Sequence, residues 1–180
     1  MNPVEAGRRR VFFALWPDAA ARRALRKAQR TLRPHLSGGR WVPESNWHIT
    51  LAFLGSVEEA VMPKLCELAA GLPAIEGELT LDTLEHWPRP RVLCLTPAAT
   101  PAPLVELADS LADAARGLGV PVENRPYRAH LTLLRALRRM PPELPILPPV
   151  PWAFGGFTLV ESAPGNSGPA YPVLARWGKD

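Results

Sequence analysis

The sequence predicts a domain of mixed helices and strands, in which two similar lobes face each other across a pseudo-twofold axis. The main observation is a repeated motif. The apolar stretches "NWHITLAFLG" and "YRAHLTLLR" each contain the pattern His-x-Thr, starting at His48 and at His130. Polar residues at alternate positions of an otherwise apolar strand are already unusual when they occur in a single strand. A second copy argues against chance.

The spacing of the surrounding segments repeats as well. Val11 precedes His48 by 37 residues, and Val92 precedes His130 by 38 residues. Each half of the chain therefore has the pattern of strand, helix, loop and His-x-Thr strand. The two histidines are 82 residues apart, which is too long a period for a solenoid repeat, so we infer two lobes.

The chain has the length of one domain, because 180 residues lie within the usual range of about 100–200. A hydrophobic content of 47% with 21% charged residues is ordinary for a soluble globular protein. We expect a single domain over residues 1–180, with pseudo-repeats of approximately 9–90 and 91–180.

In the first half, "RVFFALW" (10–16) predicts a strand from its apolar and aromatic content. Pro17 and Asp18 then open an amphipathic helix that runs to about Pro34, since proline is tolerated in a first helical turn. The first His-x-Thr strand follows this helix.

Two more segments complete the first half. Ser56 and Glu59 have the spacing of a capping box, which predicts a helix that ends near Gly71. The alternating stretch "ELTLDTLE" (78–85) predicts one strand.

The second half begins with the strand "RVLCLTP" (91–97), and Thr100 with Pro101 starts its long helix, closed by Gly117 or Gly119. After the second His-x-Thr strand comes a proline-rich loop. The last two strands are expected in "FGGFTLVES" and "AYPVLARW", where they would complete the sheet of the second lobe. The intervening "PGNSGP" predicts a turn.

Strand geometry sends the motif residues to opposite faces. Side chains alternate along a strand, so His48 and Thr50 point one way while Ile49, Leu51 and Phe53 point into the core. With two such strands related by symmetry, two histidines and two threonines would converge in one cleft.

This set of side chains suits acid–base chemistry on a phosphate. One imidazole takes a proton from the nucleophile and the other gives one to the leaving oxygen, while the hydroxyls hydrogen-bond the non-bridging oxygens. No metal is required. Two alternatives remain: structural histidines at a sheet edge, and a metal site, although no Asp, Glu or Cys joins either motif at ligand spacing.

Charge and cysteine content narrow the function classes. The net charge of +4 is compatible with a polyanionic ligand, and five arginines without an acidic residue lie between Arg125 and Arg139. Phosphates beyond the reacting one could be held there. Cys66 and Cys94 lie in apolar contexts without Cys-x-x-Cys spacing, so we expect reduced core thiols.

The N-terminal region predicts no membrane attachment. Its apolar run, Val11 to Trp16, has six residues and is soon followed by charges, which is too short for a secretion signal or a membrane span. We expect a cytoplasmic protein.

Four stretches together resemble the RNA 2′,3′-cyclic phosphodiesterases, also called 2′-5′ RNA ligases, of the two-histidine phosphoesterase superfamily: "RRVFFALWPD", "RWVPESNWHITLAFLG", "YRAHLTLLR" and "LVESAPGNSGPAYPVLARW". The resemblance covers nearly the whole chain. It implies an α+β fold with two antiparallel sheets lining a central cleft and helices packed outside. It also implies hydrolysis of RNA 2′,3′-cyclic phosphate ends to 2′-phosphates, with reversible, ATP-independent joining to a 5′-hydroxyl.

The resemblance also implies roles for the motif residues. His48 matches the proton donor to the departing 3′-oxygen, and His130 matches the base that deprotonates water. Thr50 and Thr132 match phosphate-binding hydroxyls, and Arg135 matches a basic position that often follows the second motif. No cofactor is implied.

One position departs from the family pattern. Proline commonly precedes the second histidine, whereas this chain has Ala129, which makes the approach to that strand less rigid. The expected partners are RNA ends bearing a 2′,3′-cyclic phosphate, with no membrane, and the protein is expected to be a monomer. Candidates for stacking on a terminal base are Trp41, Trp47, Phe53 and Tyr127.

Two other functions compete with this prediction. A phosphodiesterase for a small cyclic nucleotide or ADP-ribose cyclic phosphate would need the same histidines but less basic surface. A non-catalytic RNA-binding module would not need them, so the presence of both His48 and His130 argues against it.

Overall fold

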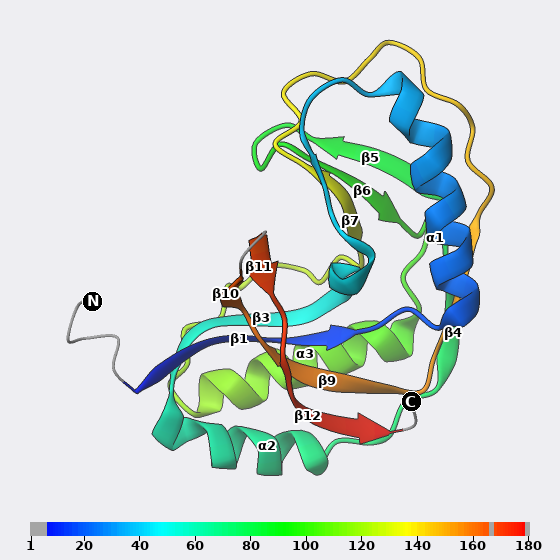
Figure 1. Ribbon diagram of the computed structural model, residues 1–180. Helices are drawn as coiled ribbons and strands as arrows, with labels where there is room; N and C mark the ends of the chain where they lie inside the picture. Colours follow the sequence, from blue (N-terminus) through cyan, green and yellow to red (C-terminus); the bar gives the residue numbers. More distant parts are fainter. Residues whose placement is uncertain (1–6, 166–167, 179–180) are drawn as a thin grey trace.

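A long antiparallel sheet runs through the molecule and bends sharply near its middle (Figure 1). The computed structural model describes residues 7–165 and 168–178. Its main sheet has the strand order β12-β9-β1-β3-β7-β6-β5, with β2 beside β7. These strands are β1 (Arg8–Leu15), β2 (Arg40–Trp41), β3 (Ile49–Glu58), β5 (Thr83–Trp87), β6 (Val92–Thr96), β7 (Leu131–Arg135), β9 (Gly156–Glu161) and β12 (Val173–Gly178).

The bend lies where β3 meets β7, because these strands pair only at Ile49 and Leu131. We call the half with β12, β9, β1 and β3 the first lobe, and the half with β2, β7, β6 and β5 the second lobe. The predicted α+β class with antiparallel sheets in two lobes is confirmed. The two halves of the main sheet are joined through one residue pair.

The remaining strands of the described residues form two smaller antiparallel pairs. β4 (Gly77–Leu81) pairs with β8 (Val150–Phe154), and β10 (Ala163–Gly165) pairs with β11 (Gly168–Ala170). The β10–β11 pair rises beside the junction of the two lobes (Figure 1). The predicted "PGNSGP" turn falls partly on residues 166–167, outside the described residues.

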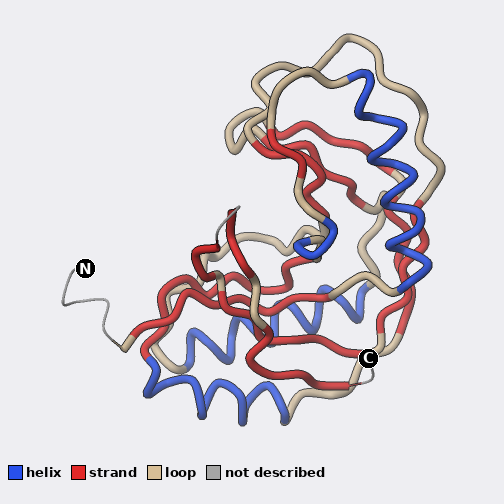
Figure 2. The backbone as a smooth tube through the Cα atoms, viewed as in Figure 1, coloured by secondary structure: helices blue, strands red, loops and turns tan. Residues whose placement is uncertain are grey.

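Each long helix packs on a lobe other than the one that holds the strand before it. α1 (Ala19–Leu32) follows β1 but lies along the second lobe against β8, whereas α3 (Ala102–Gly117) follows β6 but lies against β3 (Figures 1 and 2). α2 (Met62–Ala70) packs beside α3. The helices therefore cover the outer faces of the bent sheet.

The first helix forms as the sequence predicts. The Asp18 carboxylate accepts a hydrogen bond from the amide of Ala21 at 2.6 Å and so caps the helix. The buried residues of this helix recur every three or four positions and form one apolar face. They are Ala21, Leu25, Ala28 and Leu32.

Three sequence-based assignments are wrong. The C-terminal strands β9 and β12 extend the first lobe beside β1, not the second. The stretch 78–85 forms two strands in different sheets, broken at Asp82. Ser56 does not cap a helix, because it lies within β3 and pairs with Arg10.

Among the described residues, no helix is both long enough and apolar enough to span a membrane. Cys66 and Cys94 are both free thiols. Cys94 is buried as predicted, whereas Cys66 is only partly buried against the core.

Candidate active site

The motif residues meet where the two lobes join. Ile49 lies opposite Leu131 in antiparallel register, so His48 faces Thr132 and Thr50 faces His130 across the two strands. Directly opposite residues share a face of the sheet, and diagonal neighbours lie about 7–8 Å apart. The four polar side chains therefore gather on one face around the junction, while Ile49 and Leu131 are fully buried on the other.

Both histidine rings are held in the same way. Each histidine lies immediately before its assigned strand, and its Nδ1 faces the carbonyl oxygen two residues earlier: Asn46 at 2.7 Å for His48, and Arg128 at 2.9 Å for His130. A carbonyl only accepts, so the neutral rings carry their proton on Nδ1. Nε2 is then available to exchange a proton with a bound molecule.

Bulges after the threonines change the direction of the following side chains. In β7, Thr132 pairs with Cys94 and Leu134 with Leu93, so Leu133 is an extra residue. A bulge shifts the alternation, and Arg135 returns to the face of Thr132.

In β3, Leu51 is extra in the same way, and Phe53 lies opposite Phe12 on the face of the histidines. The prediction that Phe53 points into the core is therefore wrong, and its side chain is 43% exposed. Phe53 and Arg135 occupy equivalent places, three residues after Thr50 and Thr132.

His48 lies among aromatic rings of the first lobe. The ring centroids of Phe12, Tyr171 and Trp16 lie 5.0, 5.1 and 5.7 Å from that of the imidazole. Burial lowers the pKa of His48 to about 4, and the charges of Arg135 and His130 add to this against the opposing effect of the Asn46 carbonyl.

His130 has a more polar environment. Burial again lowers its pKa, and the nearby charges of Arg125, Arg128 and Arg135 lower it further, while the hydrogen bond to the Arg128 carbonyl opposes them. The Trp87 ring lies 4.6 Å from the imidazole. Both histidines are thus predominantly neutral near pH 7 before any anion binds.

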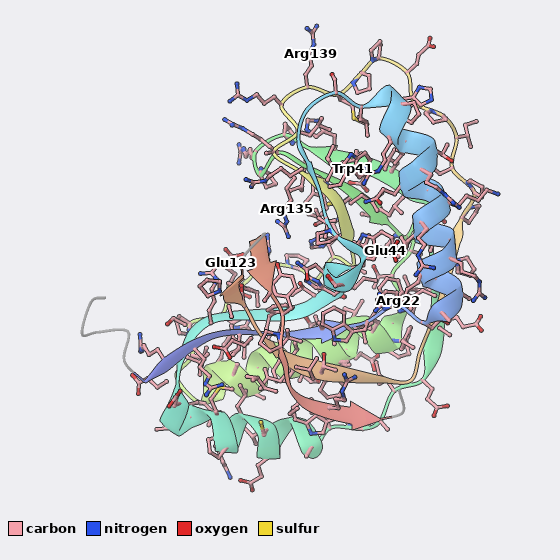
Figure 3. The ribbon with its side chains drawn as sticks, in the orientation of Figure 1. Arg22, Trp41, Glu44, Glu123, Arg135 and Arg139 are labelled. Carbon is pink, nitrogen blue, oxygen red and sulfur yellow. The ribbon has the colours of Figure 1, made fainter. Side chains whose placement is uncertain are left out.

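Arg135 influences both histidines. It projects from β7 toward the junction of the lobes (Figure 3), and its charge lowers the pKa of His48 as well as that of His130. Such an arrangement suits a dianionic or monoanionic phosphate placed between the two rings, because the guanidinium offers both charge and hydrogen-bond donors.

A pocket of about 540 Å³ opens beside this group, in the fork between β3, α3 and the segment that leads into β7. Thr50 and His130 line it, whereas His48, Thr132 and Arg135 do not. Phe53 and Tyr127 also line it, so two of the predicted stacking candidates are in reach of the site. A larger hollow of about 880 Å³ lies beyond Trp16 and contains none of the five predicted site residues.

The other predicted aromatics are placed elsewhere. Trp47 is fully buried, so it cannot stack on a base. Trp41 lies in the second lobe, with the guanidinium of Arg33 5.3 Å from its ring centroid (Figure 3). The rings that do surround the histidines were missed by sequence reasoning: Phe12, Trp16, Tyr171 and Trp87. Alternation along β1 places Phe12 and Trp16 on one face, which is a signal that could have found them.

The arginines of 125–139 do not all gather in one place, although the charges of Arg125, Arg128 and Arg135 all act on His130. Arg128 pairs with Glu85 at 2.6 Å and Arg125 with Glu123 at 3.0 Å. Arg139 lies at the far end of the second lobe, away from Arg135 (Figure 3).

The donor set does not favour a metal. In the described part of the chain, no three side chains among His, Cys, Asp and Glu lie close enough together to hold a metal ion. The two imidazoles and two hydroxyls of the site are accompanied by arginines, whose charge opposes a cation.

Known proteins resemble this chain in sequence and in fold. A family model described as LigT like Phosphoesterase matches residues 15–94 and 95–171. The RNA 2′,3′-cyclic phosphodiesterase of Escherichia coli K12 is 34% identical over 172 residues, covering 93% of this chain and 95% of the relative. The Thermus thermophilus protein of the same name is 31% identical, covering 93% and 89%.

Solved structures agree with this. E. coli LigT in its apo form superposes with a TM-score of 0.83 at 33% identity, over 96% of this chain and 98% of that one. The TM-score and identity are the same for E. coli LigT complexed with 3′-AMP. TT0787 of T. thermophilus superposes with a TM-score of 0.81 at 29% identity, over 94% and 97%. With the family model matched across most of its length, the chain belongs to the LigT-like phosphoesterase family.

Proposed function

We propose that this protein hydrolyses RNA ends bearing a 2′,3′-cyclic phosphate to 2′-phosphomonoesters, by metal-independent catalysis with two histidines. The observation that carries the proposal is the matched pair of imidazoles, each with Nδ1 bound to a backbone carbonyl and Nε2 available at the junction of the lobes. The names of the E. coli and T. thermophilus relatives support the choice of substrate.

In this mechanism His130 is the base. Its neutral Nε2 removes a proton from water, and the oxygen attacks phosphorus as the bond to the 3′-oxygen breaks. His48, as the imidazolium, gives its Nε2 proton to that leaving oxygen. The hydroxyls of Thr50 and Thr132 donate to the non-bridging oxygens, and Arg135 neutralises the charge that develops there.

The low pKa of His48 suits this role once substrate is bound. An imidazolium with a pKa near 4 is a stronger acid than an ordinary one, but it is scarce in the unliganded protein near pH 7. The negative charge of the bound cyclic phosphate favours the imidazolium and raises the pKa of His48. The substrate therefore helps to protonate its own acid.

The same residues could join RNA ends. If a 5′-hydroxyl replaces water, its oxygen attacks the cyclic phosphate, the 3′-oxygen leaves, and a 2′-5′ phosphodiester forms. One diester replaces another, so we propose that the reaction is reversible and needs no ATP.

The test uses an oligonucleotide with a 2′,3′-cyclic phosphate end, incubated with the protein in EDTA, with a mononucleotide 2′,3′-cyclic phosphate and a 3′,5′-cyclic nucleotide as comparison substrates. We expect a 2′-phosphate product from the oligonucleotide. Activity that is lost in EDTA and restored by a divalent ion would contradict the metal-independent mechanism. Turnover of the mononucleotides alone would favour the small-molecule phosphodiesterase, and binding without turnover would favour the RNA-binding module.

A further inference from the structure

Glu85 lies at the centre of a group of side chains beside the approach to His130. Both of its carboxylate oxygens accept hydrogen bonds from Nη2 of Arg128, each at 2.6 Å. Trp87 Nε1 and Thr96 Oγ1 each donate to the same carboxylate at 2.9 Å. Burial raises the pKa of Glu85, but these hydrogen bonds and the Arg128 charge outweigh it and lower the pKa overall, so Glu85 is ionised.

This group reaches the His130 ring by two routes. The backbone carbonyl of Arg128 accepts the hydrogen bond from His130 Nδ1 at 2.9 Å. The Arg128 guanidinium also lies 5.1 Å from the centroid of the Trp87 ring, which in turn lies 4.6 Å from the imidazole. Glu85 binds both Arg128 and Trp87, so it ties together the two groups that contact the ring.

The backbone before His130 has no regular secondary structure to hold it, although Ala129 itself is fully buried. Residues 120–130 form neither helix nor strand, and Ala129 stands where a proline would restrict the chain. The carbonyl of Arg128 can orient His130 only if the backbone of Arg128 is itself held. The side chain of Arg128, bound to β5 and packed on Trp87, provides that attachment.

The first lobe has a corresponding attachment. The residue whose carbonyl binds His48 is Asn46, and its side-chain Nδ2 donates to the backbone oxygen of Pro169 at 2.8 Å. Just before it, the backbone oxygen of Glu44 accepts from Arg22 of α1 at 3.0 Å (Figure 3). In both lobes, therefore, the residue two positions before the histidine is fixed by its own side chain.

We propose that Glu85 is a positioning residue for His130, acting through Arg128 and Trp87 to hold the imidazole as the Nδ1–H tautomer with Nε2 toward the phosphate. The proposal takes the role of His130 from the proposed function. Glu85 itself does not touch the reacting atoms.

The first test is Glu85→Gln. Glutamine keeps the size and one acceptor oxygen, but its amide nitrogen donates, so one of the two bonds from Arg128 is lost together with the bond from either Thr96 or Trp87. Imidazole ¹⁵N NMR should show predominantly Nδ1–H for neutral His130 in the unaltered protein and a mixture of tautomers in the variant. The kcat for the cyclic phosphate oligonucleotide should fall by about 10–100-fold, because a small misplacement of the base slows the reaction strongly, while KM changes little.

The pKa of His130 is a second quantity to measure in the Glu85→Gln variant. The groups that face this ring are Arg125, Arg128, Arg135, His48 and, through Arg128, Glu85. Glu85→Gln removes a negative charge and loosens the Nδ1 hydrogen bond, and both changes lower the pKa of His130. The matched control is Glu58→Gln, which breaks an exposed cross-strand ion pair with Arg8 at 2.9 Å. It should alter neither the tautomer nor the pKa of His130.

Arg128→Gln and the double variant separate positioning from charge. If Glu85 positions His130, each single variant should give mixed tautomers and reduced kcat, and the double variant should be no worse than either. If it acts by charge alone, the two single variants would shift the His130 pKa in opposite directions with an unchanged tautomer, which would overturn the proposal. The tautomer is measured without turnover, so it tests the proposal even if hydrolysis of cyclic phosphate is not observed.

Discussion

The surroundings of His48 and His130 differ, although the two rings are held by the same backbone hydrogen bond. Rings of the first lobe enclose His48, including Phe12 and Tyr171. Ionic and polar groups of the second lobe surround His130, including the Arg128–Glu85 pair. The repeated scaffold sets the position of each imidazole, while the residues around it determine its chemistry.

The two histidines of this nearly symmetric site therefore have different electrostatic environments. An aromatic enclosure withholds water from His48 and makes its imidazolium a strong acid. Around His130, burial also lowers the pKa, and the charges of the nearby arginines lower it further, so this ring is neutral as well before an anion binds. Both pKa shifts have the same direction, so the assignment of His48 as the acid and His130 as the base remains part of the proposed mechanism.

Removing either imidazole should have the largest effect. We expect His48→Ala and His130→Ala each to lower the rate of hydrolysis by about 10²–10⁴-fold, the usual value of a positioned acid or base. Rates are measured on the cyclic phosphate oligonucleotide. No loss in either variant would refute the mechanism with two histidines.

The leaving group separates the two roles. A substrate whose departing oxygen is already a good leaving group needs little help from an acid, so it should rescue His48→Ala much more than His130→Ala. Rescue of His130→Ala alone would exchange the roles of the two histidines.

Arg135 and Phe53 provide a second comparison, because they occupy equivalent places in the two motifs. Arg135→Ala should lower kcat/KM by about 10–100-fold through the loss of a charge-assisted hydrogen bond to phosphate. It should also raise the pKa of both histidines, since its charge lowers both. Phe53→Ala removes a pocket wall and the ring under Arg10 but no charge, so we expect a smaller loss, mainly in KM. Equal losses of kcat/KM in the two variants would show that the two motifs contribute equally to catalysis.

The burial of His48 predicts a pH dependence of stability. Its pKa is about 4 in the folded protein and about 6.5 in an unfolded chain. Between these values the unfolded state binds more protons, so the free energy of unfolding should fall as the pH drops from 6.5 to 4, by on the order of 2–3 kcal/mol from this group. Urea unfolding at pH 7, 5 and 4 measures this change. The same series on His48→Gln should be flatter, and an identical slope would show that His48 is not the cause.

The smallest expected effect concerns the aromatic enclosure itself. Tyr171→Ser should admit water to His48, raise its pKa toward 6.5 and lower the hydrolysis rate by less than about tenfold. NMR titration of His48 measures the shift, with His130 in the same spectrum as the control. A shift of equal size at both rings would mean that the two environments are not independent.

The sequence predicts much of the site but less of the topology. The repeated His-x-Thr pattern is local, and alternation alone places His48 and Thr50 on one face. The Asp18 cap is local too. The placement of β9 and β12 is not, because β9, to which β12 is joined, pairs with β1 more than a hundred residues earlier.

Predictions from local sequence patterns were also wrong where strand pairing favoured a different structure. The Ser56 capping pattern yielded to a strand that continues to Glu58 beside β1. The extra residues Leu51 and Leu133 redirect Phe53 and Arg135, and nothing in their apolar context marks them as bulges. The Glu85–Arg128 pair joins residues 43 positions apart, so it could not be predicted from the sequence without the fold.

The exchange of helices between the lobes bears on how the protein unfolds. α1 is covalently attached to the first lobe but buries its apolar face on the second, and α3 does the reverse. Neither half of the chain can bury its helix without the other, so fragments divided near residue 90 should not fold separately. We expect one cooperative unfolding transition, and slow folding, because the contacts that complete each lobe span most of the chain. Loss of structure in either lobe would then release both histidines together.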